Sequence, residues 1–195
     1  MKTKIEIKKE LTQSEVENII TQLHTKHKNI DNISEFVNAL AILVKELTPS
    51  KEVYIFIEKE GMYETLNVNK KLIIDVQTSI GMLSKCCQTK EPLFINDVKR
   101  DKNYNAKIDN FFDYPLKNLL LIPLLDKDKE MIGIIWSGIP EGDWNQYIQS
   151  DINHMMSVTK EFEPLFIQHI DTYKSSGLVK KIQSWFSSSK KVRGN

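Results

Sequence analysis

The sequence predicts an α/β chain of the α+β type, in which helices pack on an antiparallel sheet and further helices lie at both ends. The clearest sign is a hairpin pattern, in which the apolar runs 119–125 and 131–135 are separated by the polar tip 126–130. A β-rich run over 53–57 predicts a central strand. Apolar residues at steps of three or four over 148–173 predict a long helix towards the C-terminus.

The composition is that of an ordinary globular protein. The 195 residues are 41% apolar and 27% charged, and the formal net charge is only +1. This length suits one domain with extra helical segments, and so small a net charge gives no overall attraction to nucleic acid. No apolar run approaches the roughly 20 residues of a membrane-spanning helix, and residues 1–13 lack the apolar core of a secretory signal. Because Cys86 and Cys87 are adjacent and form no disulfide framework, we expect a reducing, cytoplasmic setting.

The first part of the chain predicts two helices followed by strands. The first helix begins at Thr12 or Ser14 and ends near Asn29. The second begins at Asp31 or Asn32, carries a wide apolar stripe and is stopped by the Thr-Pro-Ser run that follows it. Strands are then expected over 53–57, 62–68 and 72–74.

The middle of the chain predicts a short helix, a short strand and a polar passage rich in aromatic residues. Ser79 is the predicted N-cap of a short helix that the run Lys90-Glu91-Pro92 terminates. The apolar run 93–95 has the length of a strand only. Over 101–115, aromatic side chains are spread over a polar background, which indicates a short helix and a loop that cover another part of the protein.

Several short segments form a recognisable pattern in this order and spacing: Ser79-Ile80-Gly81, Thr89-Lys90-Glu91-Pro92-Leu93, Ile95-Asn96-Asp97-Val98, Asp101-Lys102-Asn103-Tyr104-Asn105, Asn118 to Leu124 and Glu130 to Ile135. With them the chain from about Asp31 to Lys174 resembles a GAF domain, the small sensory module of phosphodiesterases, histidine kinases and bacterial regulators. The resemblance implies an antiparallel sheet with helices packed on it and a pocket roofed by the segment after Asp97. The expected organisation is an N-terminal extension with a helix (1–30), a GAF-like domain (31–174) and a basic amphipathic tail (175–195).

The resemblance names no ligand or cofactor. Cyclic-nucleotide-binding GAF domains carry an Asn-Lys…Phe…Asp-Glu signature, whereas this chain has Ser137-Gly138-Ile139 at its start and Ile152 where the glutamate would stand. Bilin-binding members attach the pigment to a cysteine that is commonly followed by histidine, and here Gln88 follows Cys87. Members that reduce free methionine sulfoxide use separated cysteines, whereas these two are neighbours.

If there is a ligand, it is expected beneath residues 96–114. Aromatic walls with a few polar groups are typical of small-molecule pockets. The alternative is that the aromatic side chains fill a closed core, that the polar residues cap helices and turns, and that Trp136 simply packs. The candidate pocket residues are Asn96, Asp97, Tyr104, Asn105, Phe111, Phe112, Tyr114 and Trp136.

Four other groups of side chains are interpreted as structural, and no metal site is predicted. Lysines flank His27 and separate the tip carboxylates, and free cysteines commonly pack as small apolar side chains. For the cysteines a thiol sensor stays open as the alternative, and for the last pair a haem ligand does. The groups are His24 with His27, Cys86 with Cys87, the tip carboxylates of Asp126, Asp128 and Glu130, and His154 with His169.

The long helix should kink at Pro164 and end at the run 175–177. Beyond it, residues 177–195 form a basic amphipathic pattern, in which apolar side chains can share one helical face between clusters of lysine. Such a helix suits an anionic membrane surface or an acidic groove of a protein partner. The alternative is that it docks on its own domain or on a dimer mate.

Three hypotheses for function follow. The first is a cytoplasmic sensory GAF protein that binds an unknown small molecule and signals through a homodimer formed by its helices, or through a partner. The second is an interaction module without a ligand. The third is an enzyme that resembles the thiol-based methionine sulfoxide reductases. We expect no output domain of its own after Gly177 and no nucleic-acid partner.

Overall fold

The structure, a computed structural model, describes residues 12–27, 32–66, 72–75 and 80–191. Within α5, and in parts of α1, only the backbone of some residues is described, including His24, His27 and the tail from 176 onward. The elements are α1 (Gln13–His27), α2 (Ile33–Leu47), β1 (Glu52–Lys59), β2 (Met62–Thr65), β3 (Ile73–Ile74), α3 (Met82–Thr89), β4 (Leu93–Asn96), the 3₁₀-helix η1 (Val98–Arg100), α4 (Ala106–Asp109), β5 (Leu116–Leu125), β6 (Met131–Pro140) and α5 (Gln149–Lys191).

The strands form one open, antiparallel sheet in the order β3-β2-β1-β6-β5-β4. The predicted hairpin is confirmed as β5–β6, with Ile122 opposite Ile135 in its middle. At its tip, the Asp126 carboxylate accepts hydrogen bonds from the backbone N–H groups of Asp128 (2.9 Å) and Glu130 (2.8 Å). The predicted α+β class, with an antiparallel sheet and helices packed on it, is therefore confirmed.

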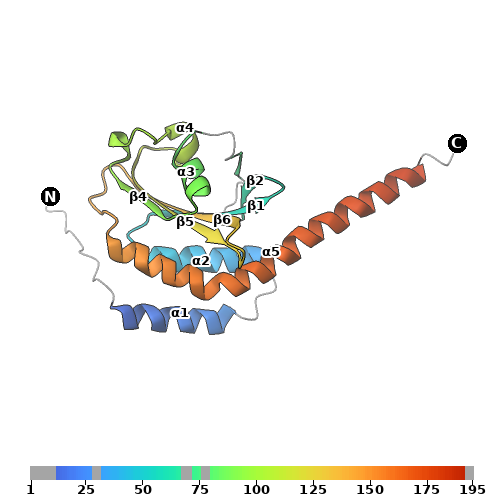
Figure 1. Ribbon diagram of the computed structural model, residues 1–195, viewed down its shortest axis with the longest axis horizontal. Helices are drawn as coiled ribbons and strands as arrows, with labels where there is room; N and C mark the ends of the chain where they lie inside the picture. Colours follow the sequence, from blue (N-terminus) through green and yellow to red (C-terminus); the bar gives the residue numbers. More distant parts are fainter. Residues whose placement is uncertain (1–11, 28–31, 67–71, 76–79, 192–195) are drawn as a thin grey trace.

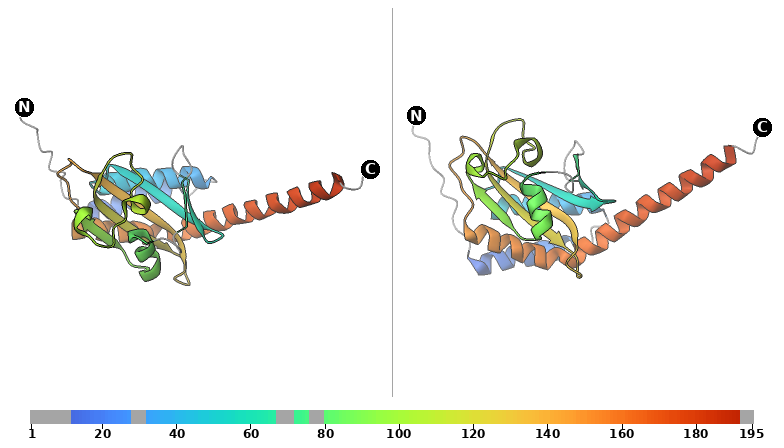
Figure 2. Two further views of the ribbon diagram at one scale, coloured as in Figure 1. Left: turned by 90° about the horizontal axis from the view of Figure 1, so that it is seen from above. Right: turned by 45° about the horizontal axis from the view of Figure 1, so that its top comes forward.

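Helices cover both faces of this sheet (Figure 1). On one face lie α2 and α5, with α1 packed beneath them as a further layer, and on the other lie α3 and α4 (Figure 2). Each face has its own core of buried apolar side chains. Along β5, Leu120 and Ile122 face the α2–α5 core, whereas Leu119 and Leu121 face the α3–α4 core. This double coverage explains why β5 is apolar at consecutive positions rather than at alternate ones.

The helix starts are set by local hydrogen bonds. The N-terminus of α1 has a capping box, in which Thr12 Oγ1 accepts from Glu15 N–H and Glu15 Oε2 accepts from Thr12 N–H. For α2, Asn32 is the N-cap, with its side chain accepting from Ser34 N–H. Both starts agree with the sequence prediction. The predicted end of α1 near Asn29 lies outside the described residues.

The boundaries of two helices, α3 and α5, differ from the prediction. Helix α3 starts at Met82 after Gly81, three residues beyond the predicted cap Ser79, which itself lies outside the described residues. Ile80, which follows the predicted cap, therefore precedes the helix, and it is 80% exposed. The start is later because the first N–H groups of α3 are bound by a distant side chain, described below, and not by a local cap.

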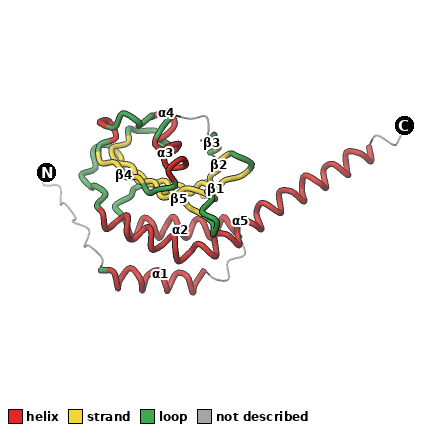
Figure 3. The backbone as a smooth tube through the Cα atoms, in the orientation of Figure 1, coloured by secondary structure: helices red, strands yellow, loops and turns green. Residues whose placement is uncertain are grey.

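Helix α5 continues through residues 175–177, where it was predicted to end, and reaches Lys191. A single glycine inside a helix costs only about 1 kcal/mol relative to alanine, and the helical apolar spacing resumes at Leu178. The helix runs through Pro164 without a break and changes direction in mid-course, as expected where proline removes a backbone hydrogen bond (Figures 1 and 3). No described helix is both long and apolar enough to cross a bilayer.

Candidate ligand-binding site

The aromatic members of the predicted pocket gather on the α3–α4 face of the sheet. Trp136 of β6 is fully buried, and its ring centroid lies 5.4 Å from that of Phe111 and 5.2 Å from that of Phe112. Tyr54 and Phe56 of β1 complete the group, with Phe56 5.1 Å from Phe111 and Tyr54 5.2 Å from Trp136. These rings are in van der Waals contact with one another, so they themselves occupy the space beneath the 110–114 loop.

A buried carboxylate, Asp109 at the end of α4, fixes this face. It accepts hydrogen bonds from the backbone N–H groups of Met82 (2.9 Å), Leu83 (3.0 Å) and Asn105 (2.8 Å). Its backbone oxygen accepts from the indole N–H of Trp136 (2.8 Å). One residue therefore joins the start of α3, the start of α4 and the sheet.

The surroundings of Asp109 shift the pKa of its carboxyl group in opposite directions. Burial raises the pKa of this carboxyl above its ordinary value, while the three backbone donors lower it because they favour the ionised form. The approach to α3 is so close that a Cβ atom on Gly81 would lie 2.7 Å from the Asp109 carboxylate. Only glycine fits there, and the sequence pattern around Asp109 gave no sign of this role.

Asn96 and Asp97 serve a different purpose from the rings. The side chain of Asn96 donates to the Tyr147 carbonyl (2.8 Å) and accepts from the Tyr147 N–H (3.0 Å). Asn118 next to it accepts from Asp97 N–H (2.9 Å) and donates to the Asn145 carbonyl (2.7 Å). Through these hydrogen bonds the two side-chain amides hold the segment that leads into α5 against the sheet. The Asp97 carboxylate pairs with Arg100 on the surface (2.8 Å).

The structure does have a shallow cleft on this side, with a volume of about 380 Å³. Three predicted residues line it, Tyr104, Phe112 and Tyr114, and the last two stack with centroids 4.6 Å apart. Among the residues that the sequence did not predict here, Lys99 supplies a positive charge and Asp113 a negative one. Lys99 pairs with Glu141 (2.6 Å), and Asn110 donates to the Tyr114 carbonyl (3.0 Å).

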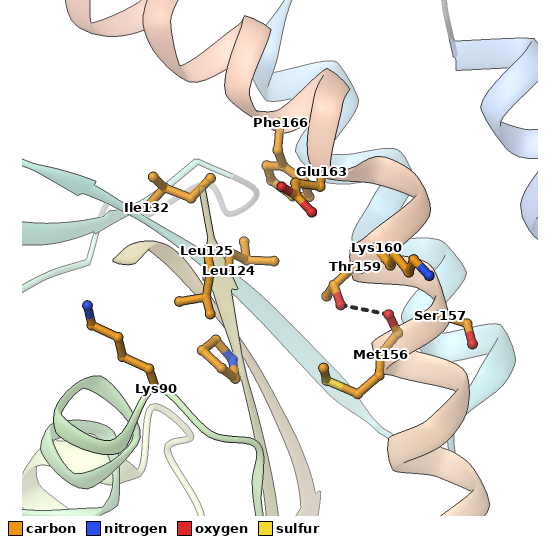
Figure 4. A pocket seen from close by; sticks show the side chains of 11 residues that line it. Lys90, Leu124, Leu125, Ile132, Met156, Ser157, Thr159, Lys160, Glu163 and Phe166 are labelled. Atoms are coloured by element: carbon orange, nitrogen blue, oxygen red, sulfur yellow. Dashed lines mark hydrogen bonds between the residues drawn. The ribbon is translucent and has the colours of Figure 1, made fainter. Parts of the chain in front are cut away.

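A second hollow of about 400 Å³ lies on the other side of the molecule, between the β5–β6 hairpin and α5 (Figure 4). Its walls are largely apolar, with Leu124 and Ile132 on the hairpin and Met156 and Phe166 on the helix, and charged side chains including Lys90 and Glu163 also line it. It exists because β4 pairs with β5 only as far as Leu121, and the proline at 123 has no N–H for a neighbouring strand. None of the predicted pocket residues lines it.

Comparison with known proteins identifies the fold. No protein-family model matches the chain, and no curated protein sequence matches it. Among solved structures, the GAF domain of a phosphoenolpyruvate-protein phosphotransferase from Coxiella burnetii matches with a TM-score of 0.63 at 15% identity, over 84% of this chain and 96% of that one. The corresponding domain from Acinetobacter matches with a TM-score of 0.65 at 6% identity, over 81% and 95%.

The chain has the fold of a GAF domain. The resemblance inferred from the sequence segments is therefore confirmed at the level of the fold. The free methionine-R-sulfoxide reductase of Neisseria meningitidis, solved with its substrate, also matches, with a TM-score of 0.62 at 11% identity, over 82% of this chain and 92% of that one. Identities this low show the fold alone, and the similar structures include both GAF domains of phosphotransferases and a reductase.

The two thiols of this chain, Cys86 and Cys87, lie on α3. Burial raises the pKa of Cys86 far above its ordinary value, with its neighbour Cys87 as the second cause. Burial also raises the pKa of Cys87, and a hydrogen bond with the hydroxyl of Tyr63 partly offsets the rise. Both thiols are therefore protonated at neutral pH, whereas the thiolate is the nucleophilic form of cysteine.

The histidines of α5 lie between helices. His154 and His169 are both buried, and the His169 ring stacks on Phe36 of α2 with centroids 4.9 Å apart. Over the described part of the chain, no three His, Cys, Asp or Glu side chains gather in a group that could hold a metal ion. His24 and His27 are outside the described side chains.

Alkaline pH is expected to destabilise the folded chain. Burial is the first cause of a raised pKa for all six tyrosines, and Tyr104 and Tyr173 reach about 12. An acid with a higher pKa in the folded than in the unfolded chain stabilises the fold below the unfolded value, near 10, and loses that contribution as pH rises through the native value. Phenolate absorbance at 295 nm should therefore rise at higher pH in the native protein than in guanidinium chloride. Coincident titration curves would contradict this expectation.

Proposed function

We propose that this chain is a regulatory GAF domain that binds a small molecule in the cleft formed by Tyr104, Phe112 and Tyr114. The observation that carries the proposal is the composition of that cleft, where a stacked aromatic pair meets Lys99 and Asp113. Apolar walls with a few orienting polar groups are typical of small-molecule sites, and about 380 Å³ lies at the small end of their range.

In this proposal α5 carries the signal away from the cleft. Asn96 and Asn118 fasten the segment before α5 to the same end of the sheet as the cleft. From there the helix crosses the sheet and extends beyond it (Figure 1). We further propose a homodimer through the helical layer, where Ile42 of α2 is 60% exposed. A single monomeric species in light scattering at micromolar concentration would contradict the dimer.

The protonated thiols support regulation over reductase chemistry. A thiol-based reductase needs a thiolate to attack the sulfoxide, and the pKa of both cysteines is raised. The free state of Cys86 and Cys87 is in keeping with the cytoplasmic setting proposed for the protein. We also propose that residues 177–195 contact the downstream partner, which is a protein or an anionic membrane surface.

A second candidate is an interaction module without a ligand, and one observation favours it. The rings of Trp136, Phe111 and Phe112 occupy the space beneath the loop that covers this face. In that case the helices alone would carry the function, and the cleft would be a surface feature.

Ligand screening separates these two candidates. A ligand at 100 times its Kd stabilises the folded state by about 2.7 kcal/mol, which corresponds to a rise of about 5–10 °C in Tm for a chain of this size. We expect such a rise with at least one compound in a panel of nucleotides, amino acids and aromatic acids. Tyr114→Ala should weaken that binding at least tenfold, whereas Trp144→Ala, which removes an 83% exposed ring outside the cleft, should leave it unchanged. A panel without any shift favours the interaction module.

A further inference from the structure

The short strand β2 contacts both faces of the sheet through two consecutive buried side chains. Tyr63 belongs to the core on the α3 side, and its hydroxyl hydrogen-bonds with the thiol of Cys87 on α3. Glu64 points the other way, towards α5, because successive side chains of a strand lie on opposite faces. A displacement of β2 therefore moves side chains on both faces of the sheet at once.

On the α5 side, Glu64 is held by a three-residue contact, which we call the Lys59–Glu64–Tyr173 latch. The hydroxyl of Tyr173 donates to Glu64 Oε1. The Nζ of Lys59 lies 3.9 Å from the same carboxylate oxygen and 4.5 Å from the centre of the Tyr173 ring. The side chain of Glu64 is only 7% exposed, so these interactions are shielded from water and are stronger than their surface equivalents.

The latch lies where α5 leaves the domain. Among the described side chains of α5, Ile170, one turn before Tyr173, is the last that belongs to the α2–α5 core. Beyond Tyr173 the helix continues away from the sheet, in the two views of Figure 2 as well as in Figure 1. The Glu64 contact therefore helps to set the direction in which the projecting part of α5 points.

Strand β2 is suited to movement. It has four residues, pairs with β1 on one side, and has only the two-residue β3 on the other. Short elements near a sheet edge with few pairing partners open at lower free energy than central strands. The long strands β5 and β6, in contrast, are buried on both faces.

We propose that β2 couples the two faces of this sheet, so that a change at Tyr63 and α3 alters the Lys59–Glu64–Tyr173 latch and the direction of the projecting part of α5. The coupling free energy between two sites is the same in both directions, so a change at the latch also alters the environment of Cys87. The proposal concerns β2, α3 and α5 alone, and it holds whether or not the cleft at Tyr114 binds a ligand.

The first test perturbs the latch and reads the opposite face. Tyr173→Phe removes one hydroxyl, and Glu64→Gln removes the charge while keeping the shape of the side chain. In the full chain, both should speed the alkylation of Cys87 by iodoacetamide at least threefold, measured by tandem mass spectrometry. Thr172→Val, which removes an exposed hydroxyl beside the latch on α5, is the matched control and should leave the rate unchanged. Rates of Cys87 alkylation within twofold of wild type in both latch variants would overturn the proposal.

The second test runs in the other direction. Tyr63→Leu should speed hydrogen exchange of backbone amides around Tyr173 several-fold more than exchange at Val158, which is buried in the first part of α5. Tyr104→Leu serves as the control, since Tyr104 packs on the same core but from the segment before α4. If hydrogen exchange became faster uniformly along α5, by the factor that the loss of global stability in urea predicts, Tyr63 would act on overall stability only. That result would refute the coupling.

Discussion

Replacing Asp109 with alanine is expected to lower the free energy of unfolding by about 3–5 kcal/mol. The change leaves the N–H groups of Met82, Leu83 and Asn105 without their acceptor inside the protein. A buried donor without a partner costs about 1–3 kcal/mol, and bonds to a charged acceptor are at the strong end. It also removes the negative charge from the N-terminus of α3, where the helix dipole stabilises an anion.

Urea denaturation followed by circular dichroism measures this loss. Asp113→Ala is the control, because Asp113 is an exposed carboxylate four residues away and its replacement should change stability by no more than about 0.5 kcal/mol. Asp109→Asn keeps an oxygen acceptor without the charge and should fall between the two. Equal stabilities of the Asp109→Ala and Asp113→Ala proteins would show that α3 and α4 are held by other contacts.

Replacing Trp136 with alanine is expected to cost about 3–5 kcal/mol. The indole is fully buried, contacts three other aromatic rings and donates to the Asp109 carbonyl, so its removal leaves a large cavity and an unpaired acceptor. Trp136→Phe keeps most of the ring but loses the hydrogen bond, and a smaller loss of about 1–2 kcal/mol is expected.

Near-UV circular dichroism adds a local readout for the same pair of variants. The tilted and edge-on ring contacts around Trp136 place Phe111, Phe112 and Tyr54 in a fixed asymmetric environment, which should weaken in Trp136→Ala. Trp144→Ala, at an exposed ring, is the control for stability. If Trp136→Ala were as stable as Trp144→Ala, the aromatic group would not be a packed core.

The sheet and its helical layer were predictable because their signals are local and repeated. The β5–β6 hairpin follows from two apolar runs around a polar tip, and the starts of α1 and α2 from Thr12 and Asn32 beside apolar spacing. The two helix boundaries that were wrong have different causes. The start of α3 is set by Asp109, 27 positions from Met82, and α5 continues through Gly177 although glycine commonly ends helices.

The candidate site was predictable in part for the same reason. Aromatic residues in a polar stretch indicated buried rings, and Tyr104, Phe112 and Tyr114 do line a cleft. Nothing in the sequence distinguishes the buried Asp109 from the exposed Asp113 nearby. Likewise, Asn96 and Asn118 act through backbone groups of Tyr147 and Asn145, and such pairings depend on the fold rather than on residue type.

The length of α5 beyond Tyr173 has a mechanical consequence. From Lys174 to Lys191 the helix continues without interruption, and at 1.5 Å per residue this segment is about 27 Å long. This segment can act as a lever that pivots near Tyr173, where α5 leaves the edge of the sheet. A tilt of only about 10° at that pivot would move the far end by about 5 Å, close to the rise of one helical turn. Motion too small to disturb the packing of the sheet would thus become, at the tip, a displacement large enough to remake or break a contact with another molecule.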